Sequence, residues 1–190
     1  MTWTSRTVVG AVVTLSLALS ACGLVESVLG QRGPVATLAK NYETPAAVDH
    51  PPSPDVTLEL AFDHDTAELL WGKHVPDDLP RRRGEPYRAG IHGDIDRVDF
   101  DNQAIALWWG GEATCPQSVT DVQLSGRSTV ELHTTEEEPT CADMEVSFRM
   151  VLAIDRDRLP NVSQLPGNLV VVTDGNRRHA GQVVPFTDGD

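Results

Sequence analysis

Carboxylate and imidazole side chains are the groups in this sequence best suited to acid–base chemistry. Asp63-His64-Asp65 is a triplet in which two carboxylates flank an imidazole. Such neighbours raise the pKa of a histidine and suit it to proton transfer. A helix N-cap explains both acids more simply, because an aspartate at that position accepts hydrogen bonds from free backbone N–H groups. We therefore expect a helix to start here and predict no catalytic residue.

Four further acids, Asp94, Asp96, Asp99 and Asp101, lie close together in the sequence. Several carboxylates at short spacing are typical of calcium-binding loops. An EF-hand also needs regular acid spacing, a glycine at the sixth place and a closing glutamate, and this segment has none of them. A solvated turn between strands is therefore favoured. The sequence predicts no metal site and no cofactor, although cation binding by these acids stays an open question.

The cysteines offer a different chemistry. Cys22 closes the segment Leu19-Ser20-Ala21-Cys22, which resembles the bacterial lipobox, a branched residue and two small residues before an obligatory cysteine. The small side chains give a peptidase access to the bond, and the thiol is the group that can accept a diacylglyceryl thioether. The resemblance implies that the mature chain begins at Cys22.

The residues before Cys22 have the composition of an export signal. Residues 1–7 are polar with one cation, Arg6, and residues 8–19 are mostly apolar. A transmembrane helix needs about 20 apolar residues, so this stretch predicts a lipoprotein signal peptide, residues 1–21. Two acyl chains on Cys22 would hold the protein on the outer face of the cell membrane. An ordinary secretory signal with an incidental cysteine is the alternative.

Two cysteines remain once Cys22 is assigned to lipid. Cys115 and Cys141 then form the natural disulfide pair of an exported protein. A metal site is the competing interpretation, but the sequence has no C-x-x-C motif and no clustered Cys/His pair. Residues 119–124 and 128–133 flank a Ser-Gly turn and predict a β-hairpin. The disulfide is expected to join the open end of that hairpin.

The charge of the chain limits the class of partner. Its formal net charge is −13 at pH 7, and removal of residues 1–21 takes away Arg6 and no acid. Phosphate backbones are bound by clustered Lys and Arg. The clear basic run, three arginines at residues 81–83, lies in a Pro- and Gly-rich segment that fits a solvated loop. The composition therefore argues against a nucleic-acid partner.

Apolar residues alternate with period two over residues 56–62 and 144–154 and run almost without a break over residues 103–109, and both patterns predict strands. Residues 103–109 are apolar on both faces, as expected of a central strand. One short helix is predicted over residues 66–71. The predicted fold class is mainly β, a small antiparallel β-sandwich or open barrel with one short helix. The alternative is α+β, with an antiparallel sheet covered by a helix.

The domain layout follows from the proline content. Residues 22–55 contain several prolines and no sustained alternation, so we predict a lipid anchor followed by a tether. If flexible, this tether would span about 30 Å. Residues 56–190 are predicted to form a single globular, mostly β domain.

Three tryptophans are candidates for partner binding. Trp108 and Trp109 are consecutive, so in a strand they point to opposite faces. Core packing is favoured for both, but a partly exposed one could bind a sugar or a protein partner. Trp71 closes the predicted helix. We take Trp71, Trp108 and Trp109 as the candidate partner-binding residues.

Several segments together resemble a set of uncharacterised actinobacterial secreted lipoproteins. Besides the lipobox and the proline-rich spacer, they are W-x-x-x-V-P-D-x-L-P at residues 71–80, Val98-Asp99-Phe100-Asp101, the stretch from Trp109 to Pro116, a distant second cysteine, and Asp155-Arg156-Asp157-Arg158-Leu159-Pro160. The resemblance covers most of residues 56–186. It implies a localisation and a domain layout, because the function of that set is not established.

No G-x-S-x-G, H-E-x-x-H or S-x-x-K motif is present in the sequence. We therefore predict a cell-envelope lipoprotein that acts as a non-enzymatic binding or structural module, with an envelope protein or the cell wall as partner. One alternative is an envelope hydrolase with a dispersed carboxylate site. Another is a carrier of a small apolar ligand held inside the β fold.

Overall fold

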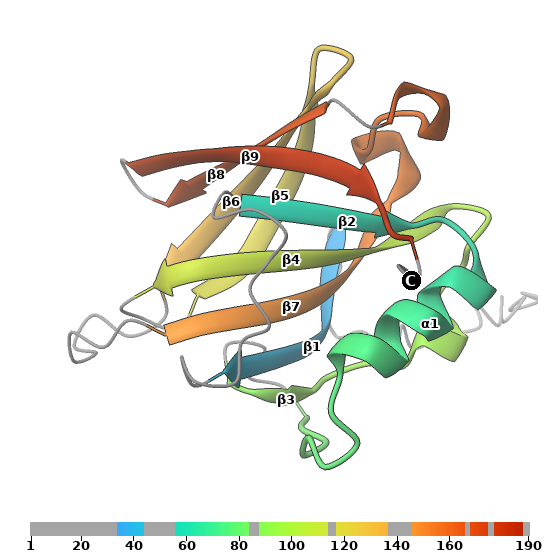
Figure 1. The fold of residues 1–190 in the computed structure, drawn as a ribbon, viewed down its shortest axis with the longest axis vertical. Coiled ribbons are helices and arrows are strands. Elements are labelled where there is room, and N and C mark those ends of the chain that lie inside the picture. Colours follow the sequence, from blue (N-terminus) through green and yellow to red (C-terminus); the bar gives the residue numbers. More distant parts are fainter. Residues whose placement is uncertain are drawn as a thin grey trace, which may run out of the picture.

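The computed structural model describes residues 34–43, 56–83, 88–113, 117–136, 146–165, 168–174 and 177–187. The strands in these ranges are β1 (Val35–Glu43), β2 (Val56–Ala61), β3 (Gly90–Ile91), β4 (Gln103–Ala113), β5 (Gln117–Ser125), β6 (Thr129–Glu136), β7 (Val146–Asp155), β8 (Asn168–Asp174) and β9 (Arg177–Pro185). The helices are α1 (His64–His74) and the short 3-10 turns η1 (Ile95–Arg97), η2 (Arg156–Arg158) and η3 (Val162–Gln164). The predicted mainly β class with one short α-helix is confirmed (Figure 1). Among the described helices, none is long and apolar enough to span a bilayer.

The strands form one sheet in the order β3-β1-β7-β4-β2-β9-β8-β6-β5. Most neighbours are antiparallel, but β2 pairs with β9 and β6 pairs with β8 in parallel. The expectation of an antiparallel sheet is therefore corrected to a mixed one. Parallel neighbours need a long crossover between them, and here each such crossover contains other strands, which a local apolar pattern does not reveal.

The sheet curls so that β5, at one edge, lies against β1, near the other edge (Figure 1). No hydrogen-bonded pairing joins these two strands in the described residues, so the sheet is an open barrel rather than a closed one. Side chains from both halves fill the space between them, among them Leu58, Trp108, Val122, Leu132 and Met150. Their exposed fractions are 0–2 %, so these side chains pack closely against one another.

A second core lies between the outer face of the sheet and α1 (Figure 1). Ala67 and Leu70 of the helix pack with Ile105 and Leu107 of β4 in this core. Alternate residues of β4 thus enter the two cores, which confirms the prediction of a central strand buried on both faces. Helix α1 is thereby fixed across β1, β7, β4 and β2, which all contribute residues to this second core.

The start of α1 confirms the predicted cap. The carboxylate of Asp63 accepts hydrogen bonds from the backbone N–H of Thr66 at 2.8 Å and from its hydroxyl at 3.0 Å. These bonds lower the pKa of Asp63. The carboxylate is therefore used in capping the helix.

Strand β1 corrects the predicted tether. Residues 35–43, inside the range 22–55, pair with β7 and β3, and Leu38 and Lys40 are fully buried. A bulge between Thr37 and Ala39 breaks the alternation of apolar residues, and a lysine occupies a core position, so the sequence pattern did not indicate a strand. The folded domain begins by Val35 rather than at residue 56.

The hairpin predicted over residues 119–133 is present. Strands β5 and β6 pair antiparallel around a turn in which Gly126 has a φ of 68°, a value that favours glycine. Strands β8 and β9 also pair antiparallel, with Asp174 opposite Arg177.

We predict that Leu38→Ala lowers the free energy of unfolding by about 2–5 kcal/mol, because it leaves a cavity beneath α1. Urea denaturation of the full chain measures the change. The matched control is Leu69→Ala, at a side chain that is 51 % exposed, with an expected change below about 0.5 kcal/mol. Equal, small effects of the two substitutions would show that β1 does not contribute to the fold.

Candidate functional site

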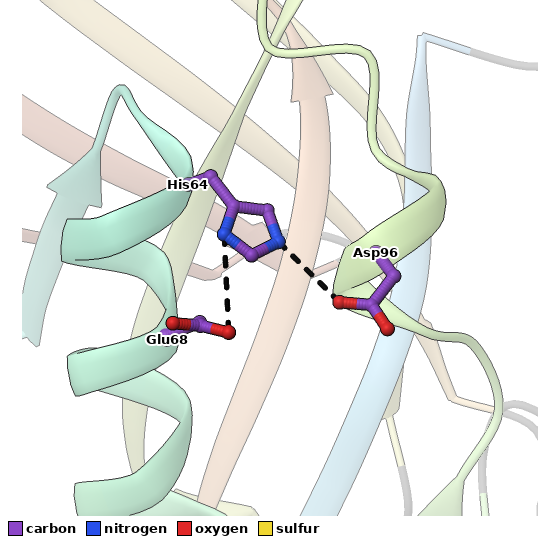
Figure 2. Close-up of side chains that lie close together, drawn as sticks. All are labelled: His64, Glu68 and Asp96. Carbon is purple, nitrogen blue, oxygen red and sulfur yellow. Dashed lines mark hydrogen bonds and ion pairs between the residues drawn. The ribbon is translucent and has the colours of Figure 1, made fainter.

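His64, Glu68 and Asp96 form one candidate site (Figure 2). His64 and Glu68 lie one turn apart on α1, and Asp96 comes from η1. Each imidazole nitrogen lies near one carboxylate, with Nδ1 3.9 Å from Glu68 Oε1 and Nε2 3.3 Å from Asp96 Oδ1 (Figure 2). The three side chains are 43 %, 60 % and 72 % exposed, respectively. Water screens their charges, so the ion pairs themselves add little stability.

Local structure positions these side chains. The carboxylate of Asp94 accepts a hydrogen bond from the backbone N–H of Asp96 and caps η1. The edge of the Phe100 ring packs against the His64 ring with centroids 5.7 Å apart. The segment predicted as a solvated turn therefore contains a 3-10 turn and contributes Asp96 to the site. The sequence placed His64 beside Asp63 and Asp65, whereas the fold brings it to an acid 32 residues away.

A second cluster crosses strands β2, β4 and β7 on the helix-covered face. The indole Nε1 of Trp109 donates a hydrogen bond to Glu59 Oε1 at 3.0 Å. The guanidinium of Arg149 lies 4.0 Å from the centre of the Trp109 ring. Both contacts fix the orientation of the indole. Burial raises the pKa of Glu59 even though the bond from Trp109 and the charges of Lys73 and Arg149 oppose it.

His74, at the end of α1, completes this cluster. Its ring meets Trp109 edge-on with centroids 5.2 Å apart, and its Nδ1 lies 3.3 Å from a guanidinium nitrogen of Arg149. Because arginine only donates, Nδ1 is the acceptor and the proton sits on Nε2. That nitrogen has no hydrogen-bond partner in the part of the chain that the structure describes. Burial, and then the charges of Arg149 and Lys73, lower the pKa of His74 to about 4.

The tryptophans have different environments. Trp108 is 2 % exposed inside the barrel, where its ring packs edge-on against Phe148. The core packing favoured for Trp108 is therefore confirmed, and in this structure the side chain offers almost no surface to a partner. Trp71 and Trp109 are half-buried against the second core.

Three members of the second cluster, Glu59, His74 and Arg149, were not predicted from the sequence. Glu59 and Arg149 lie on the polar face of strands predicted from their alternation, so their charges did not distinguish them from solvent-facing residues. His74 lies beyond the predicted end of the helix.

The cysteine predictions fall outside the described residues, which include none of Cys22, Cys115 and Cys141. Gln117 pairs with Glu136 at the open end of the β5–β6 hairpin, the end that Cys115 and Cys141 flank in the sequence. The arginines at residues 81–83 are exposed, as expected for a solvated loop.

Comparisons of the chain with protein-family models, curated proteins and solved structures find no match.

We predict that acid destabilises the protein through His74, since the unfolded chain takes up this proton near pH 6.5 and the fold only near pH 4. This difference corresponds to about 3 kcal/mol of stability, present at pH 7 and lost as the pH falls from 6.5 to 4. Urea denaturation at pH 7 and at pH 4 measures the free energy of unfolding of the wild type and of His74→Gln. The excess stability of the wild type over His74→Gln should be smaller at pH 4 by this amount.

Glu59→Gln is the matched control for that measurement. The raised pKa of Glu59 means that the fold binds this proton more tightly than the unfolded chain does. The difference in free energy of unfolding between the wild type and Glu59→Gln should therefore increase in favour of the wild type as the pH falls. A pH-independent difference for His74→Gln would contradict a buried, neutral imidazole.

Proposed function

We propose that this protein is a cell-envelope lipoprotein, held at the outer face of the cytoplasmic membrane by lipid on Cys22, that acts as a non-enzymatic binding module. Its partner is an envelope protein or the cell wall. The observation that carries the binding role is the Trp109–Arg149 pair, a half-buried indole fixed by a hydrogen bond and by a stacked guanidinium. Tryptophan and arginine dominate the binding energy of protein interfaces when their side chains are already oriented.

The surroundings of the pair support this role. Lys73 is exposed at the end of α1, and its ammonium lies 5.6 Å from the centre of the Phe186 ring. Trp71 and Trp109 add half-buried aromatic surface to the helix-covered side of the domain. A partner would meet rigid aromatic groups with cations beside them, in a chain whose net charge is otherwise strongly negative.

The start of the fold limits how far the domain can lie from its anchor. Residues 23–34 connect Cys22 to β1, and even a fully extended chain of this length spans only about 45 Å. A connection to residue 56 would have allowed more than twice that distance. The proposed module therefore works close to the membrane surface.

One observation favours the second candidate, an envelope hydrolase. The fold brings His64 together with Glu68 and Asp96, which are groups that could move a proton. Their exposure leaves their charges screened by water, unlike the enclosed acids and bases of most active sites. Release of soluble fragments from purified wall polymer by the wild type, and not by His64→Ala, would establish the hydrolase in place of the binding module.

We predict that a photo-crosslinking amino acid at Lys73, introduced into the protein in its native host, yields an adduct of one defined mass with a protein partner or a high-mass adduct with wall polymer. Arg149→Lys keeps the charge but loses the planar stack on Trp109, so it should reduce the yield by at least tenfold. The control position is Val162 on η3, which is 50 % exposed and outside the cluster.

Equal adducts from both positions, or an adduct that Arg149→Lys leaves unchanged, would contradict the binding role of the cluster. Circular dichroism and a thermal melt of Arg149→Lys separate lost binding from lost folding. An adduct containing wall polymer and one containing protein are told apart by digestion with a muralytic enzyme and with a protease.

We also predict that Cys22→Ser moves the protein from the membrane fraction to the medium or the soluble fraction, because the lipid has no thiol to join. Mass spectrometry of the wild type should show a diacylated Cys22 as the first residue and no free thiol at Cys115 or Cys141. Membrane retention of Cys22→Ser would contradict the anchor, and a free thiol at either later cysteine would contradict the disulfide.

A further inference from the structure

We propose that His64, Asp96 and Glu68 bind a divalent transition-metal ion, a role separate from the proposed binding surface. In this site His64 Nε2 and the Asp96 carboxylate are the ligands, and Glu68 accepts the proton that remains on His64 Nδ1. All three residues offer atoms that lie within 4.8 Å of one another.

The spacing of the two ligands fits a metal ion. One imidazole nitrogen can bind a given ion, and His64 Nε2 lies 3.3 Å from Asp96 Oδ1. Bonds of about 2.0–2.2 Å in a tetrahedral arrangement place two ligand atoms about 3.4 Å apart. An ion can therefore join these atoms with the backbone of α1 and η1 left where it is.

Glu68 supplies the interaction that a metal-bound histidine requires. Such a histidine gives its other N–H to a carboxylate or a carbonyl, which fixes the ring and makes the ligand more basic. Glu68 Oε1 lies 3.9 Å from His64 Nδ1, and the carboxylates of Glu68 and Asp96 approach the same edge of the ring (Figure 2). The small movement needed for a hydrogen bond is available because the Glu68 side chain is 60 % exposed.

The imidazole distinguishes this site from a group of surface acids. The Phe100 ring holds it edge-on, and each of its nitrogens faces a carboxylate from a different part of the site. Mixed nitrogen and oxygen ligands suit Zn²⁺ and similar ions, whereas Ca²⁺ and Mg²⁺ prefer oxygen alone. The exposed site leaves the remaining coordination positions to water.

The test is Zn²⁺ titration of the full chain in detergent at pH 7.5, followed by calorimetry and by the NMR signals of the His64 ring. His64→Ala and Asp96→Asn should each weaken Zn²⁺ binding at this site by at least tenfold. Glu68→Gln should weaken it by about tenfold, since it removes the partner of the ligand rather than a ligand. Ca²⁺ should leave the His64 signals unchanged.

Asp65→Asn is the matched control, because it removes an exposed acid of the same helix turn that is not in the site. It should leave the Zn²⁺ affinity unchanged within twofold. Equal losses for Asp65→Asn and Asp96→Asn would show general attraction of cations to acids and overturn the proposal. Unchanged His64 signals at millimolar Zn²⁺, or binding unaffected by His64→Ala, would overturn it as well.

Discussion

Burial of both faces of the neighbouring strands β4 and β7 is the constraint on which the rest of the structure depends. Ala104 pairs with Ile154 on the barrel side, and Ile105 pairs with Ala153 on the helix side. A shift of either strand by one residue would exchange its two sets of side chains. Arg149 would then enter the filled barrel, so this pairing admits a single register.

That register also determines where the charged and aromatic groups lie. Trp109 and Arg149 are directly paired residues of β4 and β7, and both point to the face that α1 covers. The helix crosses this face from its cap at Asp63 to His74, so its two ends contact different parts of the fold. The first turn meets η1 through His64, and the last turn meets the Trp109–Arg149 pair. One helix therefore helps to build both clusters.

Sequence patterns predicted the parts of this fold that depend on neighbouring residues. The strands with clear alternation, the capped helix and the β5–β6 hairpin are of this kind. Strand β1 was missed because a bulge and the buried Lys40, whose ammonium lies 5.5 Å from the centre of the Phe148 ring, hide its pattern. The parallel pairings and the approach of Asp96 to His64 depend on long-range topology. Trp108 and Trp109 could not be told apart, because both faces of their strand are apolar.

The entry of the chain gives the domain a direction relative to its proposed anchor. The carbonyl of Pro34 accepts a hydrogen bond from Asp155 N–H, and the next residue, Arg156, bonds to the carbonyls of Phe62 and Gln103. The start of β1, the end of β7 and the start of α1 therefore share one end of the sheet. The proposed lipid on Cys22 would join the domain at this end. His64 follows Phe62 by two residues, so the proposed metal site lies at the end where the chain enters the fold, while the Trp109–Arg149 pair contacts the other end of α1.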